Sequence, residues 1–321
     1  MTRIGRYLFA TTLLVAVIAS SGASTAAEVR IVCTNSALAD FTANIVNDSV
    51  DVEYIMPAGA CPSHFDTRPS DIDLIAGADI VVSLGWEPWM DDLLEASEND
   101  DAFQVQCPGL GEWNVPSGAK AYVDRIAGGL RDTGLFDNAS INTSATAYKA
   151  GIDAMAEDLR ALVRANGQVG TKVIVMQWQK AFVEWLGYNA TATYGPPEDL
   201  STEDMLRIAE AADDRDVAAI VDNLQSGTDF GSNVAAESRA IHVILTNFPG
   251  AVPGTDTYLD MIEYNTKRLI DGVQMHENKK GEIADLENQV ADLETQRMAL
   301  GAAVGVLVLL VVVLAVMYKR K

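Results

Sequence analysis

One short loop holds most of the metal-binding chemistry that the sequence offers. The stretch PAGACPSHFDTRPSD, residues 57–71, places Cys61 and His64 among glycine and proline residues after an apolar run. Imidazole and thiolate groups are typical zinc ligands, so the loop is a candidate metal site. The chain has only three histidines, whereas a closed zinc site takes four ligands. His64 therefore needs partners from elsewhere in the chain, or it contacts a different kind of ligand.

The cysteines offer one source of such partners. They are Cys33, Cys61 and Cys107. Outside the cytoplasm, an odd number of cysteines permits one disulfide with one free thiol, or a set of thiolates bound to a metal ion. The sequence alone leaves both arrangements open.

A second group of residues lies at the ends of short apolar runs and could contact an organic ligand. Tryptophans there could line a cleft or simply pack between lobes; they are Trp86, Trp89, Trp113 and Trp178. Polar residues that could orient a ligand are Asp66, Arg68, Glu87, Gln177, Gln179 and Asn247. Arg68 could equally brace its own loop. The sequence has no Ser-His-Asp set, Gly-rich phosphate loop or recognisable pair of catalytic carboxylates, so we predict that the protein is not an enzyme.

The elements that position these residues follow an α/β pattern. Short runs rich in Val and Ile, such as DIVVSLG and KVIVMQW, predict buried strands of parallel sheets. Helical stretches alternate with them, which favours an α/β architecture. About 250 residues between the two ends would suffice for two lobes, each with its own core. We predict an N-terminal lobe over 28–143, a long rigid connecting helix over 144–168, and a C-terminal lobe over 169–273.

The two ends of the chain predict where the protein resides. Residues 1–27 have a basic start, an apolar core and small residues, as in a secretory signal peptide. Residues 299–318 form an uncharged apolar run long enough to cross a bilayer, and the basic tail 319–321 would remain cytoplasmic. We therefore expect a cell-surface protein anchored in the membrane by its C-terminal helix. Its net charge of −22 argues against a nucleic-acid partner.

The segment 274–298 is charged and carries apolar residues at 3-4 spacing. This heptad-like pattern predicts a helical stalk. The stalk could associate with a second copy as a coiled coil, or it could be a single amphipathic helix that spaces the lobes from the membrane.

Several segments together resemble the solute-binding proteins of zinc and manganese ABC transporters. They are MPAGACPSHFDTRPSDIDLIAGADIVVSLG, WNVPSGAKAYVDRIAGGL, VIVMQWQKAFVEWLGY, and ILTNFPG followed by DTYLDMIEYNTKRLIDGV. The resemblance covers about Glu28 to Val273. It implies two α/β lobes joined by a long rigid helix, with a transition-metal ion, zinc or manganese, held in the cleft as transported ligand. It also implies an ABC transporter permease as partner and no catalytic cofactor.

The expected ligand set of this family, three histidines and one acidic residue, is largely replaced here. Ser63 follows Pro62 directly, so His64 comes one residue later than in the family pattern. Gly111 or Glu112 stands where the second histidine is expected, and Met176 and Gln177 stand in the third segment. Asn247 replaces the acid.

The family fold would direct the strand ends with Cys33, Cys61 and Cys107 toward the cleft. Together with His64 they would form a Cys₃His set suited to zinc. A Cys61–Cys107 disulfide with Cys33 buried is the alternative. The resemblance thus implies metal capture for delivery to a permease. A metal chelate, a small organic solute, or a membrane-tethered surface or adhesion module that lost the metal site remain alternatives.

Overall fold

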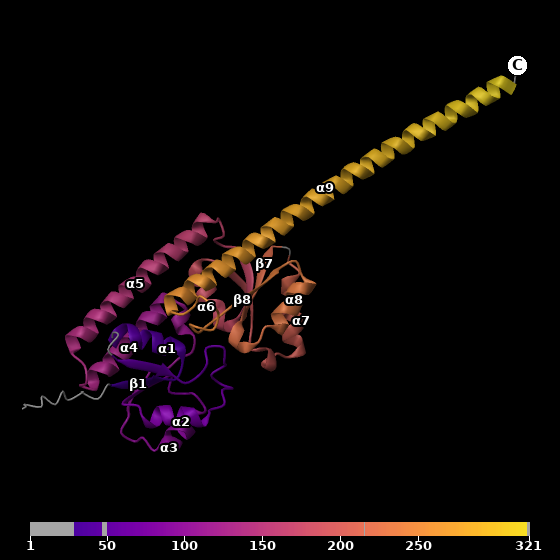
Figure 1. Cartoon of the computed structure of the whole chain (residues 1–321). Helices are drawn as coiled ribbons and strands as arrows, with labels where there is room; N and C mark the ends of the chain where they lie inside the picture. The colour runs from indigo at the N-terminus through magenta and orange to yellow at the C-terminus, as the bar shows by residue number, and fades with distance from the viewer. Residues whose placement is uncertain (1–28, 47–49, 215, 320–321) are drawn as a thin grey trace, which may run out of the picture.

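The computed structural model describes residues 29–46, 50–214 and 216–319. The predicted signal peptide and residues 320–321 of the basic tail lie outside this part of the chain. Two α/β lobes lie next to each other, and one long helix projects away from them (Figure 1).

The first lobe is built on a four-stranded parallel sheet with strand order β2-β1-β3-β4. Its strands are β1 (Arg30–Cys33), β2 (Asp51–Tyr54), β3 (Ile80–Ser83) and β4 (Phe103–Gln106). Its helices are α1 (Ser36–Val46), α2 (Pro69–Ala76), α3 (Met90–Ser97) and α4 (Pro116–Asp132). The central strand β3 is buried along its whole length, as its IVVS sequence requires.

The second lobe repeats this architecture, with strand order β6-β5-β7-β8 and parallel pairing throughout. Its strands are β5 (Lys172–Met176), β6 (Asn189–Tyr194), β7 (Val217–Asn223) and β8 (Ile241–Leu245). Its helices are α6 (Lys180–Leu186), α7 (Thr202–Ala212) and α8 (Asp229–Glu237).

Four short 3₁₀ helices follow strands β4, β5, β6 and β7 along the chain. They are η1 (Glu112–Asn114), η2 (Gln177–Gln179), η3 (Pro197–Asp199) and η4 (Leu224–Ser226). Ligands of open α/β sheets gather beyond the carboxyl ends of the strands, so these turns belong to the region where a ligand is expected.

The connecting helix is α5, which runs from Asn138 to Ala165 rather than from residue 144 to 168. The Asp137 carboxylate caps its first turn by accepting a hydrogen bond from the Ser140 amide. Gly167, with a φ of 68°, follows its end. The helix packs against α1 and α4 of the first lobe and against α6 of the second (Figure 1). It therefore bridges both lobes.

The prediction of a separate core for each lobe is wrong. One apolar cluster extends from β1 and β3 through α5 into β5 and β7, and a smaller cluster lies around Ile174, Met176 and Ile220 in the second lobe. The start of the last helix contributes to this cluster together with α5, and its Tyr258 packs edge-on against Phe41 of α1 with ring centroids 5.0 Å apart. A shared core limits how far the lobes can move relative to each other.

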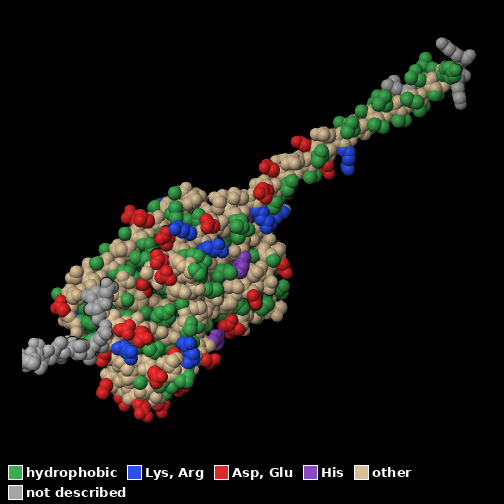
Figure 2. All heavy atoms as spheres, in the orientation of Figure 1, with side chains coloured by type: hydrophobic (Ala, Val, Ile, Leu, Met, Phe, Trp, Pro, Cys, Tyr) green, Lys and Arg blue, Asp and Glu red, His purple; other side chains and the backbone are tan. Residues whose placement is uncertain are grey.

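The last helix, α9, is a single 62-residue helix from Tyr258 to Lys319. Its buried side chains end at His276, Lys280 still pairs with Asp216 of the second lobe, and beyond the turn that contains Glu287 α9 stands free (Figures 1 and 2). The end of the C-terminal lobe, the stalk and the apolar run are thus continuous rather than separate segments. Part of α9 is long and apolar enough to cross a membrane, and that window is not buried against the described protein.

Candidate functional site

A cavity of about 370 Å³ lies between the two lobes. The first lobe contributes the His64 loop and Leu110, and the second lobe contributes residues that follow its strands. The lining residues are Cys61, Pro62, Ser63, His64, Leu110, Gln177, Trp178, Pro196, Glu198, Asp199, Asn223, Gln225, Ser226, Asn247 and Phe248. Six residues named from the sequence are among them: Cys61, Ser63, His64, Gln177, Trp178 and Asn247.

The His64 loop is held in place by the residues on either side of the histidine. The indole of Trp89 donates to the Pro62 carbonyl at 3.0 Å and packs edge-on against Phe65 at 5.2 Å between ring centroids. The His64 amide closes a turn by donating to the Cys61 carbonyl at 3.1 Å. The imidazole of His64 is exposed, so a rigid loop presents it to the cavity.

The three cysteines have different environments. Cys33 and Cys107 are fully buried, whereas Cys61 is partly exposed at the cavity. Burial raises the pKa of the Cys33 and Cys107 thiols to about 12. A thiol that resists deprotonation is a poor metal ligand, because the thiolate is the species that binds.

The structure therefore does not assemble the Cys₃His set. All three cysteines are free, so the Cys61–Cys107 disulfide is not formed either. Within residues 29–46, 50–214 and 216–319, no three His, Cys, Asp or Glu side chains are placed to hold a metal ion. The physical reason is depth: Cys33 ends a central strand inside the core and Cys107 follows β4 in the same core, and only Cys61 lies in a loop at the cavity.

Neutral amides form a network at the floor of the cavity: Asn223, Gln225 and Asn247 line it, and the buried Asn114 and Gln179, which do not line it, are hydrogen-bonded to Asn247. The Asn247 side-chain oxygen accepts hydrogen bonds from Asn114 and from Gln179, each at 2.7 Å. The Gln225 side-chain oxygen accepts from the backbone N–H of Asn247 at 3.1 Å, and the backbone N–H of Gln225 donates to the Asn223 side-chain oxygen at 2.8 Å. These five side chains carry no charge, so they can orient a polar group but do not compensate the charge of a bare cation.

Hydrogen bonds also join the lobes across this floor. The indole of Trp113 donates to the Asn247 carbonyl at 2.7 Å. The Gln225 side chain donates to the Ala58 carbonyl at 2.9 Å, and the Ser36 hydroxyl donates to the Pro249 carbonyl at 2.8 Å. The structure thus represents a state in which the two lobes are in contact at the base of the cavity.

Several residues named from the sequence lie outside the cavity lining. Trp113 is fully buried against Tyr122 and Phe248, so it packs between the lobes. Other named residues that do not line it are Asp66, Arg68, Trp86, Glu87, Trp89 and Gln179.

Three of these residues brace loops instead. Glu87 is buried and its carboxylate accepts from the amides of Leu84 at 2.9 Å and Trp86 at 3.2 Å. Arg68 precedes α2 and pairs with Asp71 at 3.4 Å. The indole of Trp86 donates to the Gly109 carbonyl at 3.1 Å. These contacts hold loops near the cavity without reaching into it.

Sequence reasoning missed two carboxylates in the lining, Glu198 and Asp199 on η3. They follow strand β6, whose NATATY sequence is too polar to stand out as a strand. The signal that could have found them is the YGPPEDL stretch, in which two prolines precede paired acids. Cys61 and His64 from one lobe and Glu198 and Asp199 from the other line the same cavity.

These features define a class of protein: a two-lobed α/β binding protein with a cavity between lobes bridged by a long helix. Residues 31–272 match the model of the family described as zinc-uptake complex component A, periplasmic, and the chain belongs to that family.

Relatives and solved structures agree with this assignment. The manganese-binding lipoprotein MntA of Halalkalibacterium halodurans is 25% identical over 275 residues, which cover 76% of this chain and 88% of that protein. The manganese ABC transporter substrate-binding lipoprotein PsaA of Streptococcus mitis is 32% identical over 105 residues, or 29% of this chain and 34% of that protein. A periplasmic metal-binding protein from Candidatus Liberibacter asiaticus shares the fold, with a TM-score of 0.65, 16% identity, and coverage of 77% of this chain and all of that one.

Proposed function

We propose that this protein is the extracytoplasmic solute-binding component of a metal-ion ABC transporter, with zinc or manganese as cargo. One observation carries the proposal: in a member of this family, the cavity between the lobes is lined by a thiol, an imidazole and two carboxylates. These groups are the ligand types of zinc, and carboxylates suit manganese. The role is binding and delivery to a permease rather than catalysis.

In our proposal, capture begins at the His64 loop and ends with the η3 turn. His64 and Cys61 lie on the first lobe, and Glu198 and Asp199 lie on the second. Because no three such groups are placed to hold an ion in the described part of the chain, a bound ion would have to draw η3 and the His64 loop together. The shared core restricts this movement to the loops or to a small adjustment of the lobes.

The ends of the chain support a surface location for this role. We propose that residues 1–27 direct export and that the apolar end of α9 anchors the protein in the cytoplasmic membrane. The length and composition of α9 support the anchor. The free part of α9 would then serve as a stalk that carries the lobes to the permease. Leu286, Val290 and Leu293 are exposed along this stalk, and a second copy would pack against these side chains if the stalk self-associates.

The proposal is tested by titrating the purified full-length chain, in neutral detergent, with zinc and manganese by calorimetry. We expect His64→Ala and the double variant Glu198→Gln, Asp199→Asn each to weaken binding by about tenfold or more, or about 1.4 kcal/mol. The control is Asp158→Asn, an exposed position on α5, which should leave the affinity unchanged. Binding should also weaken at acid pH, because protons compete with the metal for its ligands.

Equal affinities of the wild type and both cavity variants would refute this mode of capture. If the wild-type protein gives no heat of binding with zinc or manganese, and elemental analysis finds no metal in it, metal cargo is refuted altogether.

The amide floor favours a second candidate, a metal chelate or a small polar solute. Asn223 lines the cavity, and its buried side-chain nitrogen has no hydrogen-bond partner among the described residues. Such a donor favours a ligand that offers its own acceptor. Loss of metal binding with retained binding of a chelate such as metal citrate would favour this candidate.

A further inference from the structure

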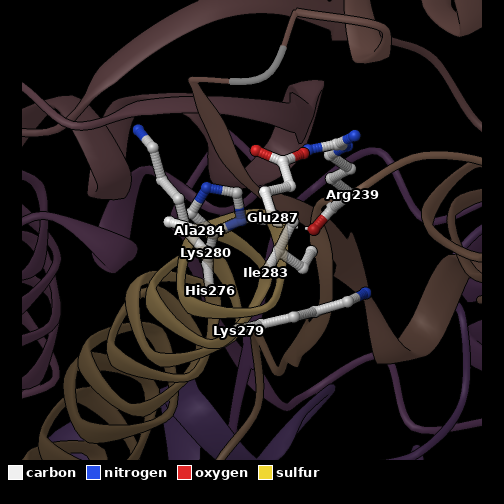
Figure 3. A pocket seen from close by; sticks show the side chains of 7 residues that line it. All are labelled: Arg239, His276, Lys279, Lys280, Ile283, Ala284 and Glu287. Atoms are coloured by element: carbon white, nitrogen blue, oxygen red, sulfur yellow. Dashed lines mark hydrogen bonds between the residues drawn. The ribbon is translucent and has the colours of Figure 1, made fainter. Parts of the chain in front are cut away.

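A second cavity lies where α9 leaves the C-terminal lobe (Figure 3). Its volume is about 180 Å³. Arg239, from the segment between α8 and β8, lies on one side, and residues of α9 form the rest of the lining. These are His276, Lys279, Lys280, Ile283, Ala284 and Glu287. None of them lines the cavity between the lobes.

The lining concentrates positive charge in a strongly acidic protein. The chain has a net charge of −22, yet this lining holds three cations, Arg239, Lys279 and Lys280, and one carboxylate, Glu287. Lys280 also pairs with Asp216 at 3.1 Å. Across the residues that the structure describes, Arg239 and Lys279 form no ion pair. Lys and Arg side chains are visible at the root of α9 (Figure 2).

His276 supplies the second observation. Its side chain is 3% exposed, and its Nδ1 lies 3.2 Å from the Arg239 carbonyl oxygen. Because a carbonyl can only accept, Nδ1 must carry the proton of this hydrogen bond. The other ring nitrogen, Nε2, is buried and has no partner among the described residues. Buried polar atoms are rarely left in this state, so the ring lacks one polar neighbour.

We propose that this cavity binds an oxyanion of the phosphate class. A guanidinium group and two ammonium groups suit a doubly charged tetrahedral anion, and arginine binds phosphate oxygens in pairs. Hydrogen phosphate also matches His276 in either protonation state. Its hydroxyl can donate to neutral Nε2, and its oxygens can accept from Nε2 when the ring is protonated. The carboxylates of Glu287 and of Asp216, which pairs with Lys280, oppose an anion, but the three cations outnumber these two groups.

Two sources could supply such a group: free phosphate or the phosphate of a lipid headgroup. The helix rises about 1.5 Å per residue, so Glu287 lies roughly 18 Å above the predicted start of the apolar run at residue 299. A headgroup would reach the cavity only if α9 were strongly tilted. The position therefore favours a free phosphate or phosphate monoester over a lipid.

The test uses the full-length chain in phospholipid-free maltoside detergent. Inorganic phosphate is titrated by calorimetry at constant ionic strength set with chloride. Chemical acylation of lysines is followed in parallel by mass spectrometry. We expect phosphate to bind and to protect Lys279 from acylation. The double variant Arg239→Gln, Lys279→Gln should weaken phosphate binding by about tenfold or more.

Lys267→Gln is the matched control. It removes one positive charge from α9, whereas the double variant removes two, one of them from α9, and Lys267 pairs with Glu263 on an exposed face outside the cavity lining. His276→Gln is a second variant, which should weaken phosphate binding while circular dichroism shows the fold intact. An equal loss of affinity in Lys267→Gln would overturn the proposal, because the effect would then come from net charge alone.

A second arm distinguishes the two sources. The chain is placed in nanodiscs of phosphatidylglycerol or of phosphatidylcholine without added phosphate. Protection of Lys279 in phosphatidylglycerol alone would identify a lipid headgroup as the oxyanion. Protection only after phosphate is added would identify the free ion. Absence of protection in detergent and in both nanodiscs, with or without phosphate, would overturn the proposal.

Discussion

The two lobes share one sheet topology but present different chemical groups to the cavity between them. Both sheets have four parallel strands in equivalent order. The first lobe offers an imidazole and a thiol on an exposed loop. The second lobe offers buried amides around Asn247, with carboxylates only at the η3 turn. Topology therefore fixes where a ligand lies, whereas the residues after each strand decide what it is.

The lobes also differ in the partners of two carboxylates, the half-buried Asp40 and the fully buried Asp222. In the first lobe the hydroxyl of Tyr148 on α5 donates to Asp40 on α1 at 2.7 Å. In the second, Tyr194 donates to the fully buried Asp222 at 2.5 Å, and the imidazole of His242 lies 2.6 Å from the other oxygen of Asp222. The second carboxylate has an additional partner that can carry positive charge, and the first has none among these contacts.

The first prediction tests whether Cys61 alone gives the first lobe its reactive thiol at the cavity. At pH 8, a thiol with a pKa near 12 is ionised to about one part in ten thousand. Burial also hides Cys33 and Cys107 from solvent. We expect one thiol to react with a disulfide reagent within minutes and the other two at least about a thousandfold more slowly. All three should react after denaturation.

The Cys61→Ser variant is the control, and it should lose the fast phase entirely. Only one thiol after denaturation without reductant would show instead that two cysteines are paired in a disulfide. Two fast thiols in the native protein would place a second cysteine at the cavity.

The second prediction concerns replacing a neutral amide of the second lobe with a carboxylate. Asn247→Asp keeps the shape of the side chain and retains an oxygen that accepts from Asn114 and Gln179, while it adds a negative charge at the cavity floor. A carboxylate is a better zinc or manganese ligand than an amide. We expect metal affinity measured by calorimetry to rise by about tenfold.

The matched control is Asn166→Asp, at the exposed end of α5, which should leave metal affinity unchanged. An unchanged affinity in Asn247→Asp would mean that the ion never reaches the amide floor. The comparison between the lobes would then rest on the rim of the cavity alone.

Strand burial explains which parts of this comparison the sequence could predict. The Val- and Ile-rich strands β3 and β7 are buried along their whole length, so their composition predicts them directly. The edge strands β4 and β6 carry polar residues and were not predicted. The carboxylates that follow β6 were missed for the same reason.

The candidate site was predictable only in part. The His64 loop has an unusual local composition, which the sequence shows without any knowledge of the fold. The depth at which each cysteine is buried could not be predicted in this way, because it depends on how α1 and α4 cover the sheet rather than on neighbouring residues. Likewise, the heptad-like pattern predicted the helix after residue 273, but not that its root, with His276, packs into the second lobe.

The last prediction concerns the smallest effect, the acid dependence of stability in the two lobes. Burial raises the pKa of Asp40 despite its hydrogen bond from Tyr148, so the folded state binds this proton more tightly than the unfolded state. Its contribution to stability is complete below the unfolded pKa and is lost as pH rises through the folded pKa. Asp40→Asn, which can still accept from Tyr148, should remove that loss and change stability at neutral pH by less than about 1 kcal/mol.

Asp204 in the second lobe is the opposite case, because hydrogen bonds from Ser201 and Arg207 lower its pKa. Asp204→Asn should therefore remove a contribution that is present above the unfolded pKa and is lost as pH falls. Urea unfolding followed by circular dichroism from pH 3 to 7 measures both. A change of the same sign in the pH slope of stability in the two variants, each compared with the wild type, would contradict the contrast between Asp40 and Asp204.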